Sequence, residues 1–127
     1  MILVDTSVWI DHLHNTDRRL VALLEADEVG SHPSVIEELA LGSIRQRTVI
    51  LELLGSLHQF PLLRHTEVMA FVDHRHLFGR GLSAVDAHLM GSVALIDGAQ
   101  LWTRDKRLVA ACRDVGISYL DESSTSG

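Results

Sequence analysis

Short apolar runs alternate with stretches of helical periodicity along almost the whole chain. The runs at residues 2–4, 29–32 and 100–103 are too short for helices and predict buried strands. The stretches between them place apolar residues three or four positions apart, which predicts amphipathic helices. A chain that alternates strands with helices folds into an α/β domain with a central, mostly parallel sheet flanked by helices. We therefore predict the α/β fold class.

Turn and capping residues set the boundaries of these elements. Two further strands are predicted, at residues 59–63 on the edge of the sheet and at residues 117–120. Helices are predicted at residues 6–12, 16–27, 33–42, 47–54, 83–96 and 106–115, and another begins near residue 66. The predicted N-caps are Thr6 or Ser7, Thr16, Thr66 and Ser83. Residues 1–120 then form one domain, and residues 121–127 form a polar C-terminal tail.

The charge of the chain first argues against a nucleic-acid partner, because 17 acids against 11 bases give a net charge of −6. The charge is uneven, however, since residues 41–80 carry five arginines and three acids, a sum of +2. The single cysteine excludes an intramolecular disulfide and favours a reducing, cytoplasmic location. The first residues do not read as a signal peptide, and no apolar run approaches the roughly 20 residues of a membrane span.

Several carboxylates stand where an α/β sheet would place a ligand site. Asp5 ends the first predicted strand and Asp105 closely follows another, and ligands of open α/β sheets bind outside the carboxyl ends of strands. Asp86 lies in the first turn of a predicted helix, and Glu37 and Glu38 lie within another. A helix cap, a turn or a solvated helix face explains each acid equally well when it is taken alone. The residues themselves therefore leave both interpretations open.

Four stretches of the chain form a joint pattern. They are Ile2-Leu3-Val4-Asp5-Thr6-Ser7, residues 32–42 with Glu37-Glu38-Leu39-Ala40-Leu41-Gly42, Val85-Asp86-Ala87-His88-Leu89, and residues 101–108 with Thr103-Arg104-Asp105-Lys106. In this order and at these separations the chain resembles the PIN-domain ribonucleases, and within them the VapC toxins of toxin–antitoxin pairs. The resemblance extends to about residue 120 and implies a single PIN-like nuclease domain.

The resemblance implies that Asp5, Glu38, Asp86 and Asp105 are the metal-binding and catalytic acids. Glu38 is preferred to Glu37 because it directly precedes the small and apolar stretch that ends in glycine. Thr6 and Thr103 match hydroxyl positions that support such a site. Lys106 stands where some members of the family carry a further acid, so a fifth metal-binding acid is not expected.

Converging carboxylates offer hard oxygen ligands, which favour Mg²⁺, with Mn²⁺ as a substitute, over Zn²⁺. One or two such ions would activate a water and stabilise the leaving oxygen of a phosphodiester. In this interpretation Asp5 is the central ligand, Glu38 and Asp86 hold the first ion, and Asp105 binds a second ion or orients the water. The predicted contacts to flanking phosphates are Arg45, Arg47 and Arg80.

The function implied by the resemblance is that of a Mg²⁺-dependent endoribonuclease toxin, which hydrolyses RNA such as tRNA or rRNA and so inhibits translation. It also implies a homodimer, with the apolar residues between 68 and 78 as a candidate contact surface, and a cognate antitoxin whose C-terminal segment covers the acidic site. Two alternatives stay open: an α/β phosphohydrolase or phospho-acceptor domain with Asp5 as its nucleophile, and a non-catalytic module that binds RNA or protein. Phospho-acceptor domains normally have a second acid where this chain has Ser7.

Overall fold

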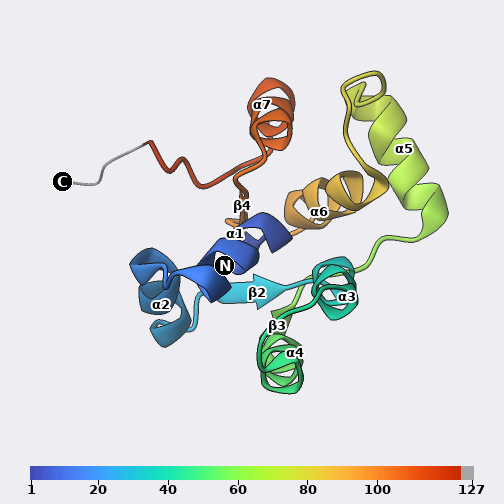
Figure 1. Ribbon diagram of the computed structural model, residues 1–127. Coiled ribbons are helices and arrows are strands. Elements are labelled where there is room, and N and C mark those ends of the chain that lie inside the picture. Colours follow the sequence, from blue (N-terminus) through green and yellow to red (C-terminus); the bar gives the residue numbers. More distant parts are fainter. Residues whose placement is uncertain (124–127) are drawn as a thin grey trace.

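Four short parallel strands form the centre of the fold in the computed structural model, which describes residues 1–123 (Figure 1). Along the sheet they lie in the order β3-β2-β1-β4. Their bounds are Ile2–Val4 for β1, Val29–Ser31 for β2, His58–Gln59 for β3 and Gln100–Trp102 for β4. Every pairing is parallel, with Leu3 of β1 opposite Gly30 of β2 and Leu101 of β4. The predicted α/β class is confirmed.

Seven helices flank this sheet within the described residues (Figure 1). They are α1 (Thr6–His14), α2 (Arg18–Glu25), α3 (Pro33–Leu41), α4 (Arg47–Ser56), α5 (His65–Arg75), α6 (Ala84–Ala94) and α7 (Lys106–Val115). Helix α3 packs beside α4, and α5 packs beside α6. Within the described residues, no helix combines the length and the apolar character that crossing a membrane requires.

The hydrophobic core surrounds β1 and β4, the strands that lead into Asp5 and Asp105. Leu3, Val4, Leu101 and Trp102 are completely buried, as the continuous apolar runs predict for strands covered on both faces. Burial of each such side chain contributes on the order of 2 kcal/mol to folding. The two strands are therefore rigid supports for the residues that follow them.

Three helices use a different N-cap from the predicted one, and α2 also begins at Arg18, two residues after its predicted start. The Asp5 side chain accepts a hydrogen bond from the Thr6 N–H and so caps α1, in place of Thr6 or Ser7. Asp17, and not Thr16, caps α2. Helix α5 begins at His65, where Glu67 accepts the Arg64 N–H, and so Thr66 is not its cap. Several residues able to cap stand side by side at each of these starts, and capping propensity alone does not choose between them.

Both strands predicted near the sheet edges are shorter than expected. Only His58 and Gln59 belong to β3, since Pro61 lacks the N–H that a longer strand would need. At residues 117–120 the chain forms a single parallel bridge, between Leu101 and Tyr119. Of the predicted polar tail, residues 121–123 form a turn in which Asp121 accepts hydrogen bonds from Ser123, and residues 124–127 lie outside the described part.

Candidate active site

Asp5 occupies the carboxyl end of the central strand β1, and only 7% of its surface is exposed. One oxygen, Oδ1, accepts the Thr6 N–H at 2.8 Å. The other, Oδ2, accepts the Thr103 hydroxyl at 2.7 Å and the Ser7 hydroxyl at 3.0 Å. Hydrogen bonds to a carboxylate are strong, and three donors from two segments fix its orientation. Asp5 is thus a preorganised acidic group and not simply a helix cap.

Thr103 joins Asp5 to the segment that carries Asp105. Its hydroxyl donates to Asp5 and accepts the Asp105 N–H at 3.1 Å. Ser7 makes a second link of the same kind, because its hydroxyl donates to Asp5 and accepts the Arg104 N–H at 3.1 Å. Ser7 was not among the predicted site residues. Its position two residues after Asp5, on the first turn of a helix, was the signal in the sequence.

Glu38 lies on the exposed surface of α3, where Thr6 connects it to the site. The Thr6 hydroxyl donates to Glu38 Oε1 at 2.7 Å, across 32 positions of sequence. Glu37 is also exposed, and within residues 1–123 its side chain makes no hydrogen bond or ion pair. The fold therefore ties Glu38, and not Glu37, to the end of β1.

Asp86 lies in the first turn of α6 and is half-buried. It forms a capping box with Ser83, in which each side chain accepts the other residue's N–H. Partial burial raises the pKa of Asp86 above its ordinary value, and the negative charges of Asp105 and Asp5 raise it further. The sequence left a helix cap and a site acid as alternatives for Asp86. In the structure Asp86 takes part in the cap of α6 and also lies near Asp105 and Asp5.

Asp105 is exposed and caps α7. Its Oδ1 accepts the Arg107 N–H at 2.9 Å and the Leu108 N–H at 3.4 Å. Within residues 1–123 its Oδ2 has no hydrogen-bond partner, so one oxygen is available to a ligand. The cap and the ligand function use different atoms and do not compete.

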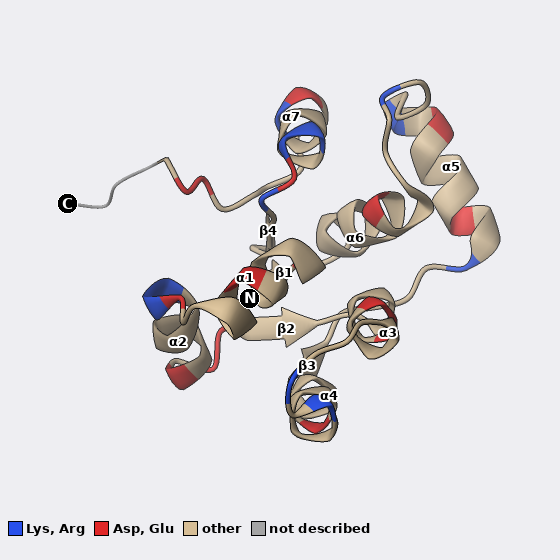
Figure 2. Cartoon of the chain, in the orientation of Figure 1, with Lys and Arg blue, Asp and Glu red and all other residues tan. Residues whose placement is uncertain are grey.

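The acids come from four elements and gather at the carboxyl edge of the sheet; Figure 2 shows acidic residues on α3, on α6 and at the beginning of α7. The Thr103 hydroxyl links Asp5 to the Asp105 backbone, and the Thr6 hydroxyl binds Glu38. The negative charges of Asp105 and Asp5 act on Asp86 and raise its pKa. Among residues 1–123, no three His, Cys, Asp or Glu side chains close around one ion-sized position. The donor set is nevertheless all oxygen, which suits Mg²⁺ or Mn²⁺, and the mutual repulsion is what a cation would relieve.

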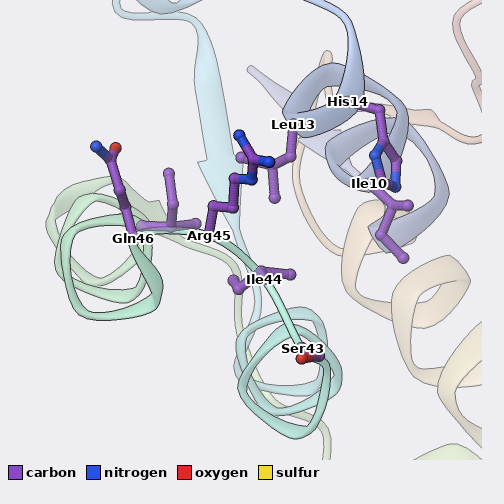
Figure 3. Close-up of a pocket in the computed structure, with 8 residues that line it drawn as sticks. Ile10, Leu13, His14, Ser43, Ile44, Arg45 and Gln46 are labelled. Atoms are coloured by element: carbon purple, nitrogen blue, oxygen red, sulfur yellow. The ribbon is translucent and has the colours of Figure 1, made fainter.

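The three arginines predicted to contact phosphates lie in different surroundings. Arg47 donates to the Ala40 carbonyl at 3.0 Å, and Arg80 forms an ion pair with Asp114 at 2.6 Å. Arg45 makes no ion pair within residues 1–123 and lines a groove of about 680 Å³ between α1 and the connection from α3 to α4 (Figure 3). The fold therefore already uses the guanidinium groups of Arg47 and Arg80.

Arg104 stabilises the loop that carries Thr103 and Asp105, a role that no local sequence pattern indicated. Its guanidinium forms ion pairs with Asp11 at 2.9 Å, Asp17 at 2.5 Å and Glu122 at 3.1 Å. It also lies over the Trp102 ring, 5.7 Å from its centre. Burial alone would raise the pKa of Asp17, but hydrogen bonds from Leu20 and Arg104 lower it overall. Arg104 thus anchors the end of β4 to α1, to α2 and to the C-terminal segment.

His32 caps α3 from a completely buried position, and its titration is expected to affect stability. Its Nδ1 accepts the Ser34 N–H at 3.0 Å, a bond that protonation of Nδ1 would break. Burial, with a smaller effect from His88, lowers the pKa of His32 from 6.5 to about 4. Only the unfolded chain binds this proton between those two values. The stabilisation from neutral His32 is thus complete above pH 6.5 and is lost as the pH falls towards 4.

Denaturant unfolding at pH 7 and at pH 4 measures this effect. Wild type should lose up to about 3 kcal/mol more stability between these two pH values than His32→Asn, whose amide still caps the helix but does not titrate. Carboxylates common to both proteins cancel in the comparison. Equal losses in the two proteins would contradict a neutral buried His32.

Comparison with known proteins agrees with this architecture. Residues 2–114 match the model of the PIN domain. Ribonuclease VapC32 of Mycobacterium tuberculosis, from strains H37Rv and CDC 1551, is 64% identical over 124 residues, which cover 98% of this chain and 100% of that protein. The similarity therefore extends over essentially the whole length of both chains.

Solved structures with much lower identity share the fold. FitAB bound to an IR36 DNA fragment has a TM-score of 0.63 at 18% identity, covering 94% of each chain. FitAcB from Neisseria gonorrhoeae has a TM-score of 0.62 at 17% identity, covering 98% of this chain and 100% of that one. PAE2754 from Pyrobaculum aerophilum has a TM-score of 0.56 at 22% identity, covering 87% and 84%. With its acidic site and its relatives in agreement, this chain belongs to the PIN-domain family, among the VapC ribonucleases.

Proposed function

We propose that this protein is the toxin of a toxin–antitoxin pair and a Mg²⁺-dependent endoribonuclease, which cleaves tRNA or rRNA in the cytoplasm and so inhibits translation. The observation that carries the proposal is the fixed carboxylate of Asp5. Three donors hold it at the carboxyl end of the central strand, with acids from three other elements around it. Such a site suits phosphodiester hydrolysis that depends on a divalent ion.

Each acid has a distinct part in this proposal. Asp5 is the central metal ligand, Glu38 and Asp86 complete the first ion's site, and Asp105 binds a second ion or orients the attacking water. Bound Mg²⁺ supplies a water of lowered pKa and neutralises charge on the phosphate. The Thr103 and Ser7 hydroxyls keep Asp5 in its orientation, and the Thr6 hydroxyl does the same for Glu38.

This assignment also explains why a phospho-acceptor role for Asp5 is disfavoured. Phospho-acceptor domains normally carry a second acid two residues after the nucleophile, but this chain has Ser7 there. The Ser7 hydroxyl donates to Asp5 Oδ2 and so supports the orientation of Asp5 instead of adding a metal-binding carboxylate.

The proposed partners are an antitoxin, the RNA substrate and a second copy of the chain. An antitoxin segment carrying Arg or Lys would complement the acids of the site, three of which are exposed or half-buried. The membership of the chain among the VapC proteins supports such a partner. Within the apolar region at residues 68–78, Val68 and Leu77 are buried, whereas Met69 and Phe78 are 49% and 62% exposed and are available to a homodimer contact.

Removal of divalent ions tests the reaction directly. The purified protein should cleave RNA in Mg²⁺, stop in excess EDTA, and recover when Mg²⁺ or Mn²⁺ is restored. Cleavage should also weaken as the pH falls, because protons compete with the ion for the carboxylates. Gel analysis of labelled RNA measures all three effects. Full activity in excess EDTA would overturn the proposed mechanism.

A further inference from the structure

Arg107 lies in the first turn of α7, next to Asp105, and its side chain extends across to the loop that leads into α6. Its N–H donates to Asp105 Oδ1 at 2.9 Å. A Cβ built on Gly81 would lie 3.0 Å from Arg107 Nη1 and 3.4 Å from Arg107 Cδ. The side chain therefore lies against the backbone of Gly81, which precedes the Ser83–Asp86 capping box. It bridges the two segments that carry Asp105 and Asp86.

No carboxylate among residues 1–123 pairs with the guanidinium of Arg107. The residue is exposed, and within residues 1–123 its guanidinium makes no ion pair or hydrogen bond. The two neighbouring arginines differ in this respect. Arg104 is held by three carboxylates, and Arg80 is held by Asp114. Within the described residues, Arg107 therefore keeps a positive charge beside the acidic site that is available to an anion from outside.

The neighbouring residue Lys106 lines a groove on another side of α7, the helix whose basic residues are blue in Figure 2. Lys106, Val109 and Arg113 line a groove of about 360 Å³ against residues 119–123. Arg107 lies on the face of Asp114, whose partner Arg80 belongs to the loop before α6. The spacings of three, four and seven residues in the first set, and of seven residues between Arg107 and Asp114, agree with the helical repeat. One helix thus directs two adjacent cations to two different surfaces.

We infer that Arg107 binds a phosphate of the RNA strand next to the bond that is cleaved, and that Lys106 does not. This inference rests on the proposed ribonuclease function and extends it to a substrate contact. A phosphodiester that approaches four acids is repelled by those that a metal ion does not neutralise, so a cation placed beside them favours its binding. Arginine also binds phosphate oxygens through two parallel N–H groups, which orients the strand as well as attracting it.

Binding and cleavage are measured for Arg107→Ala, Arg107→Lys and the matched control Lys106→Ala. Binding uses fluorescein-labelled bulk tRNA in Mg²⁺, with each substitution made in an Asp5→Asn chain so that RNA stays intact. Arg107→Ala should weaken binding roughly tenfold and should reduce the slope of log K against log salt by about 0.7 to 0.9, the value for one phosphate contact. Arg107→Lys should restore part of the affinity. Lys106→Ala should change it less than about twofold.

Two glycine variants test the position of the side chain without removing its charge. Gly79 and Gly81 both have positive φ, +73° and +76°, so alanine strains the backbone similarly at either position. A Cβ on Gly79 meets nothing within 4 Å, whereas a Cβ on Gly81 would lie 3.0 Å from Arg107 Nη1, so the Arg107 side chain would have to shift. Both variants should lose similar thermal stability, but only Gly81→Ala should weaken tRNA binding.

The outcomes separate this inference from the function on which it rests. If the wild-type chain neither binds nor cleaves RNA, the proposed function fails. If wild type cleaves RNA but Arg107→Ala behaves like Lys106→Ala, the function stands and the inference is overturned. Equal loss of binding in Gly79→Ala and Gly81→Ala, with intact folding, also overturns the placement of Arg107.

Discussion

Asp5→Asn is expected to abolish RNA cleavage, with a loss on the order of 10³-fold or more. The substitution removes the negative charge from the centre of the acid group and keeps the shape of the side chain. The amide oxygen can still accept the Thr6 N–H, so the cap of α1 is retained and the chain should fold. Loss of cleavage in a folded variant then reports on the site itself. The measurement is the rate of cleavage of labelled RNA, with a thermal melt to verify folding.

The two adjacent glutamates of α3 provide the control for this result. Glu38→Gln should reduce cleavage strongly, because Glu38 is a proposed ligand and is joined to Thr6. Glu37→Gln removes the same charge from the same exposed helix and should leave the rate unchanged. A comparable loss in both variants would indicate a general effect of charge and would contradict the assignment of Glu38.

Thr103→Val is expected to lower cleavage by about 10- to 100-fold, the usual effect of losing a group that orients a metal ligand. The side chains have nearly the same shape, but valine neither donates to Asp5 Oδ2 nor accepts the Asp105 N–H. Because Thr103 is buried, the substitution should also reduce stability by about 1–3 kcal/mol. Titration with Mn²⁺ should show weaker ion binding as well.

Thr103→Ser distinguishes the hydroxyl contact from packing. Serine keeps the hydroxyl and loses one methyl group, so it should recover most of the cleavage and of the Mn²⁺ affinity. If Thr103→Val binds Mn²⁺ and cleaves RNA as well as wild type does, the hydroxyl has no part in the site.

The sequence predicted the elements whose signals are local. The apolar runs that end before Asp5 and Asp105 predicted β1 and β4, because a strand buried on both faces is apolar at successive positions. The capping box at Ser83 predicted the start of α6, and Gly116 marked the end of α7. Parallel strands direct their carboxyl ends to one edge, and so the placement of Asp5 and Asp105 at the same edge also followed from the sequence. Glu38 and Asp86 lie on helices and were assigned to the site only through the family resemblance.

Features that depend on contacts between distant segments were not predictable in this way. Arg104 finds its partners 93, 87 and 18 positions away, and no local pattern relates it to Asp11, Asp17 or Glu122. The role of Ser7 depends on β1 and β4 lying side by side, which brings its hydroxyl to the Arg104 N–H. The prediction of a strand at residues 117–120 was wrong, because only Tyr119 of this stretch forms a bridge with β4.

The net charge of −6 says less about function than the positions of the individual charges do. Four of the 17 acids belong to the candidate site, and three more hold Arg104. These carboxylates have local partners or proposed ligands, so the total charge says little about nucleic-acid binding. The location of individual cations, such as Arg107 beside Asp105, is the informative quantity.

New RNA 5′ ends can be mapped in cells that produce either wild type or Asp5→Asn. Wild type should produce discrete new ends in tRNA or rRNA, and Asp5→Asn should produce none at equal protein levels. The same ends in both cultures, or no new ends with wild type, would contradict a ribonuclease that cleaves through Asp5.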